Sequence, residues 1–266
     1  MKENRIEKRL AQCREQNKKA FITYMTAGLP DMEMTAKIIK AQEEAGTDII
    51  ELGVPFSDPV ADGPVIQNAS YRSILNGTNL NKIFCMVEKL REDGCEQPML
   101  FMMYYNTVLY YGVDAFARKC AEVGIDGLII PDLPYEEQEE LQEALSAVED
   151  APILIQLVSP VSGKRIPMLL ENARGFVYCV SSMGVTGQNA DFHSNVIQYL
   201  QSVKDVSKIP VMMGFGIREA RDVEPMKDII DGCIVGSHFI DLMEKSGYDL
   251  TAIRDYVSTF KRELNQ

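Results

Sequence analysis

Short apolar runs of strand length recur eight times along this chain, and amphipathic helical stretches separate them. The runs cover residues 20–25, 47–52, 98–103, 126–130, 152–157, 175–180, 209–213 and 232–235. Eight strands that alternate with helices in 266 residues favour a (β/α)8 TIM barrel. A doubly wound open sheet is the alternative, but its first strand-to-helix turn usually carries a glycine-rich fingerprint, which residues 26–31 lack.

The helical pattern also predicts additions to the barrel. Ile6, Leu10 and Cys13 share one face of a charged N-terminal helix, and a short extra helix is expected after the eighth strand. No Ser/Pro-rich linker, charge block or low-complexity tract divides the chain. We therefore expect one (β/α)8 barrel domain over residues 1–266.

Composition and charge exclude several classes of function. The hydrophobic fraction of 46% and the charged fraction of 25% are ordinary for a soluble globular protein. A net charge of −12 argues against nucleic acid as a partner, because phosphate backbones need a basic face. The chain shows no apolar run of bilayer length and no signal-peptide pattern, so we expect no membrane contact and a cytoplasmic location. Six scattered cysteines without a CxxC pair fit buried thiols in a reducing compartment.

Residues 51–64 carry the most suggestive chemistry. Glu51 lies at the end of an apolar strand, and the loop behind it offers a second carboxylate at Asp62. In a barrel, such loops form the active face. If the side chain of Glu51 points inward, burial should raise its pKa and let it serve as both acid and base. A structural carboxylate held by hydrogen bonds is the alternative for Glu51, and Asp62 before Gly63 could equally be a turn-former.

Other catalytic groups are missing from the strand ends. The two histidines, His193 and His238, form no metal-ligand pattern, so we expect no metal site. Lys18, Lys19 and Lys208 precede strands and belong on the opposite face, which leaves a Schiff-base mechanism without a nucleophile. Carboxylates remain for proton transfer, with tyrosine and threonine hydroxyls as helpers.

Glycine-containing turns follow the seventh and eighth strands, at residues 214–216 and 236–238. Barrel phosphate sites are commonly built from these two loops and the N-terminus of a short helix. Glycines let backbone N–H groups approach phosphate oxygens, and such a site needs no Lys or Arg. The pattern therefore favours a phosphate site, with simple tight turns as the alternative.

A series of short motifs follows a specific order along the chain. They are residues 26–28 with Pro30, 51–59 with 61–64, 67–69, 104–106, 131–134, 184–187, 214–216 and 236–237. This series resembles the tryptophan synthase α subunit family, over nearly the whole length of the chain. One motif could be coincidence, but the full set in this order is highly specific.

The resemblance implies a lyase of tryptophan biosynthesis that needs no cofactor in this chain. The reaction would be the retro-aldol cleavage of indole-3-glycerol phosphate to indole and glyceraldehyde 3-phosphate. Glu51 would be the main general acid/base, which protonates C3 of the indole and helps to remove the proton of the glycerol hydroxyl. Asp62 would accept a hydrogen bond from the indole N–H and stabilise the positive charge that develops.

The resemblance also implies the substrate pocket. The residues expected to wall the indole pocket are Tyr24, Met102, Ile129 and Ile155, with Tyr178 at the glycerol end. The residues expected to hold the phosphate are Gly187, Gly216, Gly236 and Ser237, with Phe215 alongside. Thr186, in a mobile sixth loop, would close over the site and bond Asp62.

The partner implied by the resemblance is a pyridoxal-phosphate β subunit in an α2β2 heterotetramer, contacted around Pro55 and Asp58. The chain departs from the usual family residues at Leu29, Thr107 and His238, which affects pocket detail and not the reaction class. Two alternatives stay open. One is a related phosphate-binding barrel, such as an isomerase or the preceding synthase of the pathway, and the other is a chain that mainly activates the β subunit.

Overall fold

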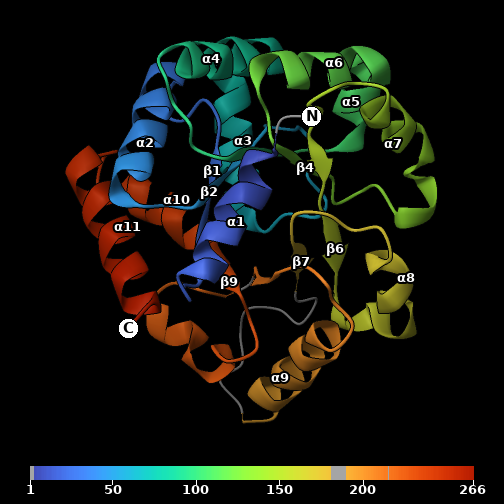
Figure 1. Cartoon of the computed structure of the whole chain (residues 1–266). Coiled ribbons are helices and arrows are strands. Elements are labelled where there is room, and N and C mark those ends of the chain that lie inside the picture. Colours follow the sequence, from blue (N-terminus) through green and yellow to red (C-terminus); the bar gives the residue numbers. More distant parts are fainter. Residues whose placement is uncertain (1–2, 181–189, 215) are drawn as a thin grey trace.

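The computed structural model describes residues 3–180, 190–214 and 216–266, apart from the side chains of residues 190–194. Within these residues a nine-stranded parallel sheet has the order β5-β4-β3-β2-β1-β9-β8-β7-β6. The strands are β1 (Ala20–Thr26), β2 (Ile49–Gly53), β3 (Met99–Met102), β4 (Gly127–Ile129), β5 (Ile153–Leu154), β6 (Gln156–Val158), β7 (Val177–Cys179), β8 (Val211–Met213) and β9 (Gly232–Val235). Because β5 and β6 are consecutive in the chain, the two ends of the sheet meet in a nearly closed barrel (Figure 1).

Helices surround this sheet (Figure 1). The α-helices are α1 (Arg5–Glu15), α2 (Met32–Ala45), α3 (Pro64–Leu75), α4 (Leu80–Glu92), α5 (Tyr105–Tyr111), α6 (Val113–Val123), α7 (Glu139–Ser146), α8 (Ile166–Leu170), α9 (Ala190–Lys204), α10 (Ser237–Lys245) and α11 (Leu250–Leu264). The 3-10 helices are η1 (Tyr135–Glu137), η2 (Pro160–Arg165) and η3 (Ala220–Met226). The predicted barrel is confirmed, with α1 as the extra N-terminal helix and α10 as the short extra helix after the last strand.

The fifth predicted strand, residues 152–157, is divided in the structure. β5 pairs with β4, whereas β6 pairs with β7. Between them, the N–H of Ile155 still donates to the carbonyl of Leu128 at 2.9 Å, so the chain changes neighbours directly after Ile155. The expectation of one uninterrupted strand is wrong here because this stretch must join the two halves of the sheet.

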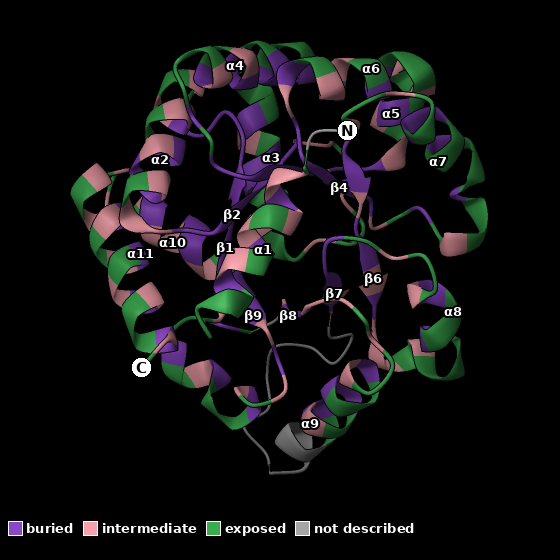
Figure 2. Ribbon diagram, viewed as in Figure 1, coloured by how far each residue is buried: buried purple, intermediate pink, exposed green. Residues whose placement is uncertain are grey.

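The inward side chains of the strands form a core of their own, inside the barrel. Its buried members are Ile6, Leu10, Cys13, Ala20, Ile22, Ile49, Leu100, Ile129, Ile153, Ile155, Phe176, Met212 and Ile234. The first three come from α1, which lies across the barrel and closes the N-terminal ends of the strands (Figures 1 and 2). A Cβ atom on Gly127 would lie 2.8 Å from Cδ1 of Ile6, so the absence of a side chain at Gly127 leaves room for helix α1.

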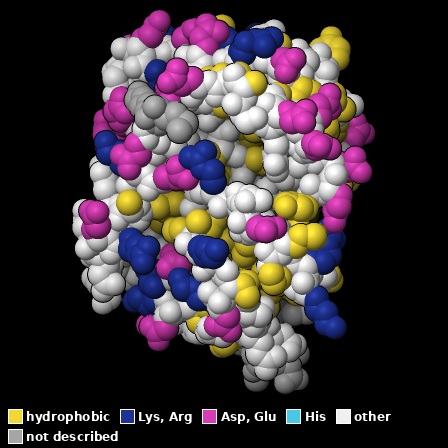
Figure 3. Space-filling view, turned by 45° about the vertical axis from the view of Figure 1, so that its right-hand side comes forward, with side chains coloured by type: hydrophobic (Ala, Val, Ile, Leu, Met, Phe, Trp, Pro, Cys, Tyr) yellow, Lys and Arg dark blue, Asp and Glu magenta, His cyan; other side chains and the backbone are white. Residues whose placement is uncertain are grey.

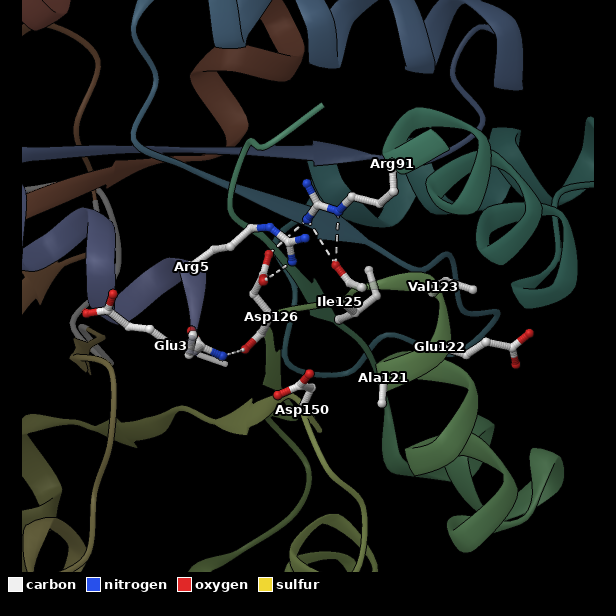
Figure 4. Close-up of a pocket in the computed structure, with 11 residues that line it drawn as sticks. Glu3, Arg5, Arg91, Ala121, Glu122, Val123, Ile125, Asp126 and Asp150 are labelled. Atoms are coloured by element: carbon white, nitrogen blue, oxygen red, sulfur yellow. Dashed lines mark hydrogen bonds and ion pairs between the residues drawn. The ribbon is translucent and has the colours of Figure 1, made fainter. Parts of the chain in front are cut away.

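Polar contacts fix the start of α1 to this end of the barrel. Arg5 Nη1 and Arg91 Nη2 each lie 2.9 Å from a carboxylate oxygen of Asp126, and Asn4 Nδ2 donates to the carbonyl of Asp126 at 2.8 Å (Figure 4). They line a cavity of about 190 Å³. Asp126 precedes β4, so this cavity is at the end opposite to the one where barrel enzymes perform their chemistry. We interpret it as structural.

The surface agrees with the acidic composition. On the face shown in Figure 3, Lys and Arg side chains are intermingled with Asp and Glu side chains and do not form one continuous basic area. Such a face offers little to a nucleic-acid backbone. In the part of the chain that the structure describes, no helix is long and apolar enough to cross a membrane.

Candidate active site

Glu51 points into the barrel, which is the condition on which the sequence argument for a raised pKa depends. Its neighbour on the same face, Ile49, belongs to the inner core, whereas Ile50 and Leu52 pack in the outer core, toward the helices. The Glu51 side chain is buried, and among the described residues neither carboxyl oxygen has a hydrogen-bond partner. The alternative of a structural carboxylate held by hydrogen bonds therefore finds no support in the structure.

Burial sets the protonation state of Glu51. Loss of solvation, and secondarily the nearby charge of Asp62, raises the pKa of Glu51 to about 8. At neutral pH this carboxyl is therefore mostly protonated. A buried acid without a partner is unfavourable for folding, so its presence at the mouth of a barrel points to chemistry.

Asp62 lies in the loop that follows β2, and its protonation state differs from that of Glu51. Its carboxylate accepts a hydrogen bond of 3.0 Å from Tyr104 Oη. Loss of solvation raises the pKa of Asp62 to about 6, while the bond from Tyr104 lowers it. At neutral pH Asp62 is thus mostly ionised. Its backbone N–H also bonds the carbonyl of Pro59 at 3.0 Å, so Asp62 is a turn residue as well as a site residue.

Glu51 and Asp62 form a pair in which one carboxyl holds its proton and the other does not. This is the arrangement that lets one site supply both an acid and a stabilising negative charge. Tyr24, which is buried, and Tyr178, which is half-buried, interact electrostatically with both carboxylates. Burial raises the pKa of both phenols, which therefore remain hydroxyl donors at neutral pH.

The residues predicted to wall the indole pocket lie on strands of the barrel, except Ile155, which lies between β5 and β6. Tyr24 lies in register with Glu51 on β1 and β2, and Met102 lies in register with Ile129 on β3 and β4. Ile129 and Ile155 belong to the inner core, against which Met102 and Tyr178 pack. These side chains thus belong to the inside of the barrel, as does the face of β2 that carries Ile49 and Glu51.

Close packing of Tyr178 depends on a glycine that sequence reasoning did not single out. A Cβ atom on Gly214 would lie 2.7 Å from Cζ of Tyr178. Gly214 follows β8 directly, and its place in the Gly-Phe-Gly turn was a signal that we interpreted only as part of a phosphate site. The structure shows a second role for Gly214: the absence of a side chain there leaves room for the ring of Tyr178.

Three of the predicted phosphate residues, Gly216, Gly236 and Ser237, follow β8 and β9, which are neighbours in the sheet. Gly216 has φ of 68°, a conformation that favours glycine. Gly236 precedes α10, and no side chain caps this helix. A Cβ atom on Gly236 would be 3.7 Å from its nearest neighbour, so packing alone does not demand glycine there. Ser237 is the exposed first residue of α10.

Several predicted residues remain outside this geometry. Thr186, Gly187 and Phe215 lie outside the described residues, as does the sixth loop that was expected to close over the site. In the loop after β2, Asp58 is exposed and Pro55 is half-buried.

Within the described residues, no group of three or more His, Cys, Asp or Glu side chains could hold a metal ion. His238 is half-buried, and its ring centroid lies 5.7 Å from that of Tyr256. Among the described residues at this end of the barrel, the carboxyl pair and the tyrosines are the candidates for proton transfer.

Comparison with known proteins decides the family. The family profile described as "Tryptophan synthase alpha chain" matches residues 10–266. The chain belongs to this family. It is 65% identical to the tryptophan synthase alpha chain of Lachnospira eligens over 98% of this chain and 99% of that protein. It is 45% identical to the alpha chain of Alkaliphilus metalliredigens over 98% of this chain and 97% of that protein.

Solved structures agree on the fold. A chain of tryptophan synthase from Mycobacterium tuberculosis superposes with a TM-score of 0.88 at 34% identity, over 99% of each chain. Tryptophan synthase subunit alpha from Legionella pneumophila superposes with a TM-score of 0.87 at 32% identity, over 98% of each chain. Membership of the tryptophan synthase alpha chain family therefore rests on sequence and on structure.

Proposed function

We propose that this chain performs the α reaction of tryptophan biosynthesis, the retro-aldol cleavage of indole-3-glycerol phosphate to indole and glyceraldehyde 3-phosphate. Family membership supports this reaction. The observation that carries the proposal is the buried carboxyl of Glu51, which has no hydrogen-bond partner among the described residues and interacts with the charge of the half-buried Asp62. The enzyme is a lyase that works by acid/base chemistry, with no cofactor in this chain.

Glu51 starts the reaction as an acid. It donates its proton to C3 of the indole ring, and the positive charge that results spreads to the ring nitrogen. Asp62 accepts a hydrogen bond from the indole N–H and stabilises this charge. A protonated Glu51 next to an ionised Asp62 is the starting state that these two steps need.

Glu51 then completes the reaction as a base. Its carboxylate takes the proton from the glycerol hydroxyl next to the bond that breaks. The electrons of that O–H bond form the aldehyde, and those of the breaking carbon–carbon bond return to the indole ring. Indole and glyceraldehyde 3-phosphate leave, and Glu51 is protonated again, so the catalyst is regenerated.

The remaining site residues bind the substrate in this proposal. Tyr24, Met102, Ile129 and Ile155 hold the indole, and Tyr178 lies at the glycerol end. Gly216, Gly236 and Ser237 hold the phosphate through backbone N–H groups and the start of α10, which supplies positive potential. By resemblance to the family, Gly187 and Phe215 complete the phosphate site and Thr186 bonds Asp62 over the substrate.

The family name implies a β-subunit partner, and we propose that the two chains form an α2β2 heterotetramer. The partner would contact the loop around Pro55 and Asp58. Two exposed apolar side chains support an interface at this end of the barrel: Val60 in the same loop is 83% exposed, and Tyr110 on α5 is 93% exposed. The pyridoxal phosphate implied by the resemblance would belong to the partner, which would receive the indole.

We further propose that the protein works in the cytoplasm. All six cysteines are free thiols, and five of them are buried, while Cys85 is exposed. Free thiols without disulfides are typical of a reducing compartment.

Indole release from indole-3-glycerol phosphate, measured with and without a β chain, tests the proposed function. Glu51→Gln should fold normally and lose about 10²–10⁴-fold in turnover, the usual loss for a general acid/base. Glu33→Gln is the matched control, because Glu33 is exposed and forms an ion pair with Lys37 on the same helix. Indole release in neither mixture would contradict the proposal, and release only with the β chain would favour an activating role.

A further inference from the structure

Tyr104 reaches across the mouth of the barrel from a neighbouring strand. It follows β3 directly and precedes α5, and its side chain is buried. Asp62 belongs to the preceding strand-to-helix loop, 42 residues earlier in the chain. The two loops are therefore joined through this tyrosine.

Tyr104 contacts the loop after β2 at three points. Its hydroxyl donates to Asp62 Oδ2 at 3.0 Å and accepts a bond from the backbone N–H of Ala61 at 2.9 Å. Its ring stacks on Phe56, with centroids 4.9 Å apart and planes 17° apart. Phe56 lies near the start of the loop and Ala61 near its end, so the Tyr104 side chain contacts both ends of the loop.

The hydroxyl of Tyr104 both donates and accepts a hydrogen bond. A phenol has one donor proton, which goes to Asp62, and lone pairs, one of which accepts from Ala61. Among the described residues, Tyr104 is the only side chain that donates a hydrogen bond to the carboxylate of Asp62, while Gln67 Nε2 donates to its backbone carbonyl at 2.8 Å. A bond from a neutral donor to a carboxylate is stronger than a bond between two neutral groups.

We propose that Tyr104 is a positioning residue for the reaction: it holds the Asp62 carboxylate, and the turn that carries it, in place to receive the indole N–H. This inference rests on the proposed function, because Asp62 matters only if a cation develops on the ring. Tyr104 acts through Asp62 and is not itself an acid or base in the reaction.

The groups around Asp62 determine how its pKa responds when the hydrogen bond from Tyr104 is lost. Among the described residues, the titratable groups that interact with the Asp62 carboxyl are Glu51 on β2, Tyr24 on β1, Tyr178 on β7 and Tyr104 after β3. Burial raises the pKa of Asp62, and the bond from Tyr104 opposes that rise. Without this bond, Asp62 would bind its proton at a higher pH.

Tyr104→Phe is the informative variant, because it keeps the ring on Phe56 and removes only the hydroxyl. The Asp62 pKa, followed by carbon NMR of labelled aspartate, should rise by about one unit, the equivalent of a hydrogen bond to a charged group. The acidic limb of kcat/KM should move to higher pH by the same amount. Tyr105→Phe is the matched control, since the Tyr105 hydroxyl bonds the exposed Glu140.

A double variant tests whether the effect passes through Asp62. Tyr104→Phe should lower kcat strongly in the wild-type background and much less in an Asp62→Asn background, because the two changes remove one interaction. An unchanged Asp62 pKa in Tyr104→Phe, or equal losses in the two backgrounds, would overturn the inference. Failure of the wild-type chain to cleave the substrate would instead overturn the proposed function, and the NMR measurement would still stand.

Discussion

A side chain on Gly53 would collide with Tyr24: a Cβ atom at Gly53 would lie 2.6 Å from Cζ of the tyrosine. Gly53 ends β2, two residues after Glu51, and Tyr24 lies in register with Glu51 on β1. The tyrosine ring therefore occupies the space that a side chain at Gly53 would fill. The glycine of the Glu-Leu-Gly motif is needed for packing beside Glu51, the proposed catalytic acid.

Gly53→Ala should therefore displace Tyr24 and disturb the site. Overpacking of this kind costs about 1–3 kcal/mol of stability, and the indole pocket should lose affinity at the same time. Urea unfolding and KM for indole-3-glycerol phosphate measure the two effects. The stability loss should shrink in a Tyr24→Val background, which removes the ring; an equal loss in both backgrounds would exclude Tyr24 as the cause.

The dependence of activity on pH follows from the carboxyl pair. Asp62, with a pKa of about 6, must be ionised, and Glu51, with a pKa of about 8, must be protonated. We therefore expect kcat/KM to rise as pH increases through about 6 and to fall as it passes about 8, which gives a bell-shaped profile of the free enzyme. Steady-state indole release across this interval is the measurement. A profile without the basic limb would contradict the role of Glu51 as the initial acid.

The same carboxyl makes stability depend on pH. The pKa of Glu51 is raised from 4.5 to about 8, so between these values the folded chain binds a proton that the unfolded chain does not. The free energy of unfolding should therefore fall as pH increases through this interval, by up to about 1.4 kcal/mol per pH unit from this group.

Glu51→Gln should flatten this slope, because the glutamine does not titrate. Urea unfolding at several pH values compares the two chains, with Glu33→Gln as a control that should keep the wild-type slope. At the upper end of the interval the inactive Glu51→Gln chain should be the more stable one, apart from any penalty for burying its amide. Equal slopes in the wild type and Glu51→Gln would show that Glu51 titrates normally.

Much of the fold could be predicted from hydrophobic periodicity. The face Ile6, Leu10 and Cys13 predicted the N-terminal helix, but not that this helix closes the barrel. That role depends on the absence of a side chain at Gly127, far away in the sequence. The change of neighbours after Ile155 could not be predicted either, because it results from closure of the whole sheet and not from a local pattern.

The candidate site, like the fold, could be predicted only in part from the sequence. An inward Glu51 was only a condition for a raised pKa at that level, and the structure shows that its side chain does point inward. The bond between Tyr104 and Asp62 could not be predicted from the residues, because it joins two loops whose distance is set by the pairing of β2 with β3. Periodicity shows which side chains share a face of a strand, but contacts between loops require the assembled barrel.

The phosphate site makes a prediction that separates ligand binding from folding. A methyl group at Gly236 would meet nothing closer than 3.7 Å, so Gly236→Ala should change the free energy of unfolding by less than about 1 kcal/mol. If the phosphate approaches the backbone here, the same methyl group should raise KM for indole-3-glycerol phosphate several-fold.

The dephosphorylated substrate, indole-3-glycerol, provides the decisive comparison. Its KM should be the same in the wild type and in Gly236→Ala, because it has no phosphate to lose. Gly63→Ala is a control for adding a methyl group to a glycine in open space, since a Cβ there meets nothing within 4 Å. If Gly236→Ala leaves KM for the phosphorylated substrate unchanged, or raises KM for both substrates equally, the phosphate does not bind at Gly236.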